Sequence, residues 1–153
     1  MYFFEMDADL SHDPAELNRF LKLKDKYDMI VGSRYMQGSK ITKWPWWRLA
    51  QSRVINKILN LWLGLSLTDY TEGYRLYGRS AVEFLTSTKL KEKGFISLSE
   101  VAFKLKKAGF KICEVPVSFT DRTLGKSNAN TKELLNSLIG AIRIRFSNSN
   151  TTN

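Results

Sequence analysis

The chain has 153 residues, 24 of them basic and 15 acidic, and carries a net charge of +9. Hydrophobic residues make up 43% and charged residues 25% of the chain, which is ordinary for a globular protein and excludes a disordered one. One cysteine, Cys113, excludes an internal disulfide framework, and no apolar run reaches the ~18 residues of a transmembrane helix. The positive charge favours anionic partners: phosphorylated ligands, an anionic membrane surface or nucleic acid.

The sequence predicts strands that alternate with helices. We expect strands in the segments 1–6, 27–32, 72–78 and 110–119, the last with Pro116 at a bend or edge. Helices are expected from 13 to about 24, at 48–63 before Gly64, at 79–85, at 97–108 before Gly109, and at 131–145. Asp13 is expected to cap the first helix, with Glu16 closing a capping box. Polar loops are expected at 36–43 and 122–130.

This alternation is typical of an α/β domain with a largely parallel sheet. We expect the domain to span residues 1–146, followed by a polar tail at 147–153. Ligands of such sheets bind at the carboxyl ends of the strands. That rule places Asp7, Asp9, the segment 32–34 and the segment 121–122 at one edge of the sheet.

Two aspartates, Asp7 and Asp9, follow the first predicted strand in the stretch "EMDADLSHDP". In an extended segment they point to the same side, and two like charges there are unfavourable unless a cation lies between them. Oxygen ligands favour Mg²⁺ or Mn²⁺, and Mg²⁺ combines one or two carboxylates with water and substrate phosphates. The pattern therefore indicates a metal and diphosphate site. The alternative is a solvated strand end that carries helix caps.

The window between Asp28 and Asp69 has no acidic residue but holds all four tryptophans among basic side chains. Such interleaving suits a membrane interface, where indole rings lie at the level of the headgroups. It also suits single-stranded nucleic acid, or a basic surface over an aromatic core. Nucleic acid leaves the Asp7 and Asp9 pattern unexplained, so we do not expect it as a partner.

The chain contains five motifs in this order: "EMDADLSHDP", "IVGSRYMQGS", "WPWWRLAQSR", "DYTEGYRLYGRS" and "ICEVPVSFTDRTLGKS". Together these motifs resemble the polyprenol-phosphate (dolichol-phosphate) mannosyltransferases, which are inverting family 2 glycosyltransferases. The resemblance covers about residues 2–146. It implies a three-layer α/β/α fold of the nucleotide-diphospho-sugar transferase (GT-A) type. It also implies transfer of a hexose to a polyprenyl phosphate on the cytosolic face of a membrane. The expected donor is GDP-mannose, which supplies mannose, and the alternative donor is UDP-glucose.

The resemblance also implies roles for single residues. Asp7 and Asp9 would hold the metal ion, and Asp9 would also be catalytic. Arg122 and Lys126 would contact the donor phosphates, and Arg122 would also be catalytic. The acceptor phosphate would be bound by Arg34, Arg48 and Ser52.

Helix spacing independently supports the acceptor-phosphate role of Arg48 and Ser52. They are four residues apart, so they share a helix face, and they lie near a predicted helix start, where anions are favoured. The alternatives are a solvated Arg48, a merely polar Ser52, and an ion pair of Arg34 with Asp28.

Several positions depart from the family pattern. Ser11 stands where some members have a glutamine ligand, and Asn128 stands where a lysine is usual. A phosphate acceptor needs no strong general base, so His12 is expected to be structural, and Glu72 is expected to pair with Arg75.

No "PTYNE"-like segment occurs, so the chain is expected to be the C-terminal part of the catalytic domain, without its nucleotide-binding half. It would require that half or a partner subunit. The competing hypothesis is a catalytically incomplete fragment that only binds a membrane or a partner.

Overall fold

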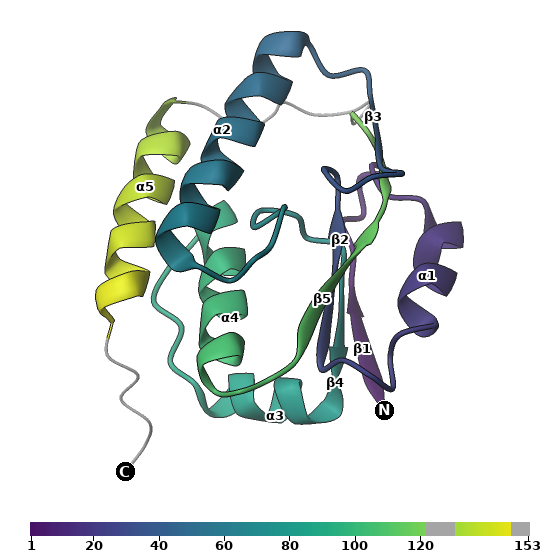
Figure 1. Cartoon of the computed structure of the whole chain (residues 1–153), viewed down its shortest axis with the longest axis vertical. Coiled ribbons are helices and arrows are strands. Elements are labelled where there is room, and N and C mark those ends of the chain that lie inside the picture. Colours follow the sequence, from purple (N-terminus) through teal and green to yellow (C-terminus); the bar gives the residue numbers. More distant parts are fainter. Residues whose placement is uncertain (122–130, 148–153) are drawn as a thin grey trace.

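The computed structural model describes residues 1–121 and 131–147. Its elements form layers around a central sheet, with α1 on one face and the helices α2, α3, α4 and α5 on the other (Figure 1). The predicted α/β class with helices on both faces is therefore confirmed. The proposed boundary between domain and tail is not tested, because residues 148–153 lie outside the described part.

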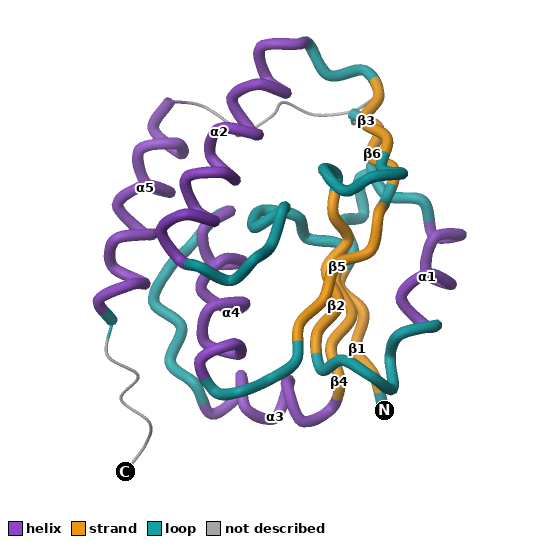
Figure 2. Tube along the Cα trace, viewed as in Figure 1, coloured by secondary structure: helices purple, strands orange, loops and turns teal. Residues whose placement is uncertain are grey.

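The strands are β1 (Tyr2–Glu5), β2 (Met29–Ser33), β3 (Lys40–Thr42), β4 (Arg75–Gly78), β5 (Ile112–Pro116) and β6 (Ser118–Thr120). The helices are α1 (Leu17–Leu21), preceded by a 3-10 turn at Pro14–Glu16, α2 (Trp46–Leu63), α3 (Arg79–Ser87), α4 (Phe95–Lys107) and α5 (Thr131–Phe146). Most of these bounds lie within two residues of the predicted ones. The loop predicted at 36–43 is partly wrong, because β3 pairs there with β6 beside the main sheet (Figure 2).

The main sheet has the strand order β1-β4-β2-β5, and it is mixed. Only β2 and β5 pair in parallel, whereas β4 pairs antiparallel with both β1 and β2. The prediction of a largely parallel sheet is therefore wrong for β4. The segment between α2 and β4 brings the chain to the edge of the sheet where β1 and β2 end, so β4 begins there and runs in the opposite direction. The other three strands share one direction, as predicted.

The start of the first helical segment is only partly as expected. The Asp13 carboxylate accepts a hydrogen bond from the Ala15 amide at 2.9 Å, which confirms the cap. Glu16 does not close a capping box, because its carboxylate accepts a hydrogen bond from the Ser118 amide at 2.8 Å and lies 3.2 Å from the Arg19 guanidinium. A tertiary contact to the chain after β5 thus replaces the local one.

Two hydrophobic cores lie on the two faces of the sheet. Met29, Val31 and Tyr77 face the helices α2 to α5, whereas Ile30 and Leu76 of the same strands face α1. The alternation follows from the period of two residues in a strand. Both faces of β2 and β4 are thereby buried.

Gly32 in β2 occupies a place where no side chain fits. A Cβ atom there would lie 2.9 Å from Val117 Cγ1, and 3.1 Å from both Phe20 Cζ and the Tyr74 carbonyl oxygen. We expect Gly32→Ala to lower the free energy of unfolding by about 1–3 kcal/mol through overpacking, measured by urea denaturation. Gly78→Ala is the matched control, because its Cβ would meet nothing closer than the Asp28 carbonyl at 3.4 Å. Equal losses in both variants would contradict the prediction.

Candidate active site

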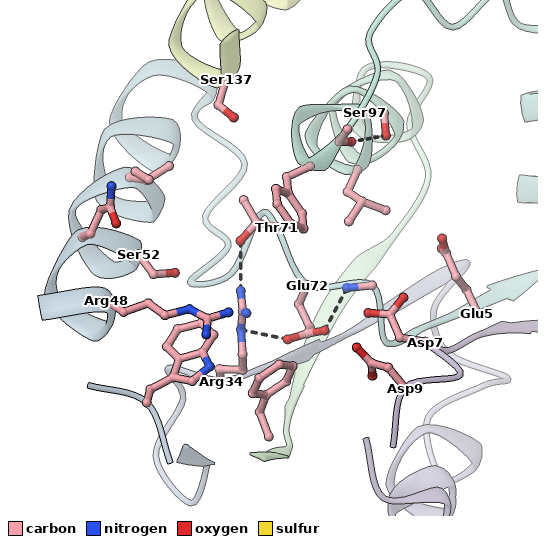
Figure 3. A pocket seen from close by; sticks show the side chains of 18 residues that line it. Glu5, Asp7, Asp9, Arg34, Arg48, Ser52, Thr71, Glu72, Ser97 and Ser137 are labelled. Atoms are coloured by element: carbon pink, nitrogen blue, oxygen red, sulfur yellow. Dashed lines mark hydrogen bonds and ion pairs between the residues drawn. The ribbon is translucent and has the colours of Figure 1, made fainter. Parts of the chain in front are cut away.

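Four segments meet at one edge of the main sheet. Because β1, β2 and β5 point the same way, the residues that follow them emerge together, and the residues that precede the antiparallel β4 reach the same edge. These segments and the inner faces of α2 and α4 enclose a cavity of about 330 Å³ (Figure 3). Asp7, Asp9 and Arg34 line it, so the prediction that they lie at one edge is confirmed.

The two aspartates of the acidic motif both line this cavity, on the side away from α2 (Figure 3). Asp9 Oδ1 accepts hydrogen bonds from the Ser11 amide at 3.1 Å and the Ser11 hydroxyl at 2.5 Å. Ser11 is buried and orients Asp9. The Asp7 carboxylate lies beside Gly73, close to where a Cβ on that glycine would be.

Within the described residues, no group of three or more histidine, cysteine or acidic side chains is placed to hold a metal ion. Asp7 and Asp9 supply two of the carboxylates that line the cavity, and two carboxylates suit an ion that completes its shell with water and ligand phosphates.

Arg34 is committed to carboxylates of the segment before β4. Its Nε and Nη2 donate to the two oxygens of Asp69 at 2.7 and 2.9 Å, and Nη2 also donates to the Thr71 hydroxyl at 2.9 Å. Glu72 Oε2 lies 2.8 Å from Nε. Burial lowers the pKa of Arg34, but the charges of Asp69 and Glu72 outweigh burial and raise it above its ordinary value. The alternative that Arg34 forms an ion pair with Asp28 is therefore wrong. With its pKa raised, the Arg34 guanidinium remains fully charged.

Glu72 connects Arg34 to His12. His12 Nε2 lies 2.7 Å from Glu72 Oε1, and His12 Nδ1 lies 3.4 Å from the Asp7 amide, which donates to it. Burial raises the pKa of Glu72, but the charge of Arg34 and the bond to His12 outweigh it and lower the pKa. Burial lowers the pKa of His12, but Glu72 outweighs it and raises the pKa.

The expected pairing of Glu72 with Arg75 is wrong. The Arg75 guanidinium instead donates to three backbone carbonyls, those of Tyr70, Glu72 and Leu98.

Arg48 and Ser52 line the cavity from α2, which confirms that they share a face (Figure 3). Arg48 Nη1 donates to both carboxylate oxygens of Asp121 at 3.0 Å, and its guanidinium carbon lies 4.3 Å from the centre of the Trp44 ring. The Ser52 hydroxyl accepts a hydrogen bond from the Tyr35 hydroxyl at 2.6 Å. Arg48 is half-buried, so the alternative of a solvated helix residue is wrong.

Two expected donor-side residues, Arg122 and Lys126, lie outside the described residues, as does Asn128. Sequence reasoning missed Asp69 and Thr71, which are hydrogen-bond partners of Arg34. The available signal was the pair of carboxylates in "DYTEGYR", which lie three residues apart at the start of a predicted strand.

The sequence model of glycosyl transferase family 2 matches residues 1–86. The chain belongs to glycosyl transferase family 2. Polyprenol monophosphomannose synthase of Mycolicibacterium smegmatis is 38% identical to it over 135 residues, which are 86% of this chain and 51% of that protein. Undecaprenyl-phosphate mannosyltransferase of Micrococcus luteus is 37% identical over 123 residues, 80% of this chain and 51% of that protein. The chain thus spans about half the length of these family 2 relatives.

No helix among the described residues is long and apolar enough to cross a membrane.

The ion pair between Asp69 and Arg34 generates a prediction about stability. Asp69 is buried, so Asp69→Asn leaves a buried guanidinium with one carboxylate fewer, and we expect a loss of about 3–5 kcal/mol in the free energy of unfolding. The measurement is chemical denaturation followed by circular dichroism. Asp25→Asn is the control, because Asp25 pairs with Lys24 on the surface and its loss should not change stability measurably. A similarly small effect of both changes on the free energy of unfolding would show that the fold does not require the buried pair of Asp69 and Arg34.

Proposed function

We propose that the chain carries the metal and acceptor side of a hexosyltransferase that transfers a hexose from a nucleotide sugar to a polyprenyl phosphate. GDP-mannose is the proposed donor and UDP-glucose the alternative. The observation that supports this most is the arrangement of charged side chains in the cavity. Asp7 and Asp9 lie on one side, and Arg34 and Arg48, each of which also pairs with carboxylates of the protein, lie on the other (Figure 3). Glu72 lies between them.

This arrangement suits direct displacement with inversion. Asp7 and Asp9 would hold Mg²⁺ or Mn²⁺, which when bound supplies positive charge next to the leaving nucleoside diphosphate. Arg34 and Arg48 would orient the acceptor phosphate, with Ser52 beside them. An acceptor oxygen forms a bond to the anomeric carbon while the bond from that carbon to the nucleoside diphosphate breaks.

The acceptor oxygen is already anionic, so no side chain of the cavity has to remove a proton from it. The contribution of the protein is positioning and electrostatic stabilisation. Arg122, and Lys126 in place of the usual lysine, are proposed for the donor phosphates on the strength of the motif alone.

The outer face of α2 supports contact with a membrane. Trp47, Val54, Ile58 and Leu61 are all exposed and are spaced so that they form one stripe along the helix. A second exposed stripe follows the neighbouring helix α5, where its members are Leu135, Ile139, Ile142 and Phe146.

Basic side chains flank the first stripe, among them the exposed Arg53 and Lys57. An apolar stripe with flanking cations suits the interface of an anionic bilayer. We therefore propose a peripheral protein at the cytosolic face of a membrane, with a nucleotide-binding segment or a partner subunit completing the donor site.

The proposed chemistry is tested by transfer of labelled mannose from GDP-mannose to a polyprenyl phosphate. The full chain is assayed together with the part of the Mycolicibacterium relative to which it does not align. We expect Mn²⁺- or Mg²⁺-dependent transfer that Asp9→Asn lowers at least ~100-fold, because the variant removes a metal-binding charge. Asp13→Asn is the control, since asparagine also caps helices and Asp13 lies outside the cavity. Absence of both transfer and metal-dependent nucleotide binding would refute the proposal.

The membrane contact is tested by cosedimentation with vesicles that contain phosphatidylglycerol. The double change Trp47→Ser and Leu61→Ser should weaken binding by roughly tenfold or more, because it removes two inserted apolar side chains. Leu21→Ser is the control, since Leu21 is exposed on α1 at the opposite face of the sheet. Asp9→Asn should leave vesicle binding unchanged. Binding that is indifferent to the double change would exclude this stripe as the contact surface.

A further inference from the structure

Two buried polar side-chain atoms in the described part of the chain have no hydrogen-bond partner, Trp44 Nε1 and Glu72 Oε2. Both residues line the cavity of the candidate active site. A buried polar group without a hydrogen bond is unfavourable, so such groups are uncommon and frequently mark sites of function. One of the two atoms is a donor and the other an acceptor, which restricts the ligands that would satisfy both.

Trp44 lies among the cations on the α2 side of the cavity. Its ring centre is 4.3 Å from the Arg48 guanidinium carbon and 5.4 Å from that of Arg34, and its other ring neighbour is Phe119. The indole N–H can only donate a hydrogen bond. Arg34 and Arg48 already pair with carboxylates of the protein, and a phosphate oxygen is an acceptor that the indole N–H can share with these two guanidinium groups.

Glu72 lies between the cations and the two aspartates (Figure 3). Its Oε1 is bonded to His12 and to the Gly73 amide, at 2.7 and 2.9 Å. Its Oε2 lies 2.8 Å from Arg34 Nε, but the single proton of Nε is directed at Asp69, 2.7 Å away. Oε2 therefore has a charge contact without a hydrogen-bond donor. A neutral hydroxyl group supplies that donor without adding a second positive charge.

We propose that Trp44 and Glu72 together bind a hexosyl phosphate, with the indole N–H donating to a phosphate oxygen and Glu72 Oε2 accepting from a hydroxyl of the hexose. This inference rests on the proposed function, whose product contains this group, and it names Glu72 as a residue that contacts the sugar. Neither atom is exposed to water, so binding has to bring each to the cavity surface by rotation of its side chain.

The test is isothermal titration calorimetry of the full chain with mannose 1-phosphate, in both anomers, and with inorganic phosphate. The wild-type chain should bind one anomer about tenfold tighter than inorganic phosphate, because a hydrogen bond to a carboxylate is among the stronger ones. Trp44→Phe keeps an aromatic ring but removes the N–H. It should weaken the binding of mannose 1-phosphate and of inorganic phosphate by a similar factor of about five to ten. Glu72→Gln should weaken the binding of mannose 1-phosphate alone, by a factor of about three to five, because a neutral amide oxygen accepts a weaker hydrogen bond than a carboxylate oxygen.

Trp47→Phe and Glu83→Gln are matched controls, because both residues are exposed outside the cavity. Circular dichroism establishes that each variant is folded. If Glu72→Gln does not fold, the four monodeoxy mannose 1-phosphates are titrated into the wild-type chain, and one of them should bind about tenfold weaker than the parent compound.

Unchanged phosphate affinity in Trp44→Phe would overturn the assignment of Trp44. Equal affinity of the wild-type chain for mannose 1-phosphate and inorganic phosphate would overturn that of Glu72. Because no nucleotide donor is present, these outcomes are independent of the transfer assay. Transfer activity together with either outcome would refute this inference alone, whereas hexosyl phosphate binding without transfer and without metal-dependent nucleotide binding would refute the proposed function.

Discussion

The guanidinium of Arg34 is the point around which the candidate site is assembled. Arg34 follows β2, its partners Asp69 and Glu72 precede β4, and Glu72 contacts His12, which follows β1. A buried cation is stable only when its carboxylates and their hydrogen bonds are all in place. The three segments therefore take up their positions together at this end of the cavity. A site that orients two charged substrates benefits from such fixed geometry.

The reversed direction of β4 determines what this edge of the sheet contains. A fully parallel sheet would bring only the ends of strands to the cavity. With β4 antiparallel, the residues before the strand arrive there as well, so that Glu72 and Gly73 lie next to Asp7. The carboxylates then fall into two sets. Asp69 and Glu72 neutralise Arg34 inside the protein, whereas Asp7 and Asp9 face the cavity and are the ones suited to an external cation.

Helix α2 relates the cavity to the surface of the molecule. Its inner face carries Arg48 and Ser52, and its outer face carries an exposed apolar stripe that includes Trp47 and Leu61. A polyprenyl phosphate has the same two parts, an anionic head and an apolar chain. One helix with opposite faces of these two kinds can bring the phosphate to the cavity while its other side contacts the bilayer. The amphipathic design of α2 thus supports the same proposal as the cavity does.

The sequence by itself determined the α/β class, nearly all helices and strands, the Asp13 cap, and the meeting of Asp7, Asp9 and Arg34 at one edge. The class, the elements and the cap follow from periodicity and turn residues, which act over short distances along the chain. The meeting at one edge follows from the rule that parallel strands end on the same side of a sheet. Only the tertiary structure decided the direction of β4, the contact of Glu16 with Ser118, the partners of Arg34, and which polar atoms of the cavity lack a hydrogen bond. Each depends on segments far apart in the chain, whose approach local patterns do not encode.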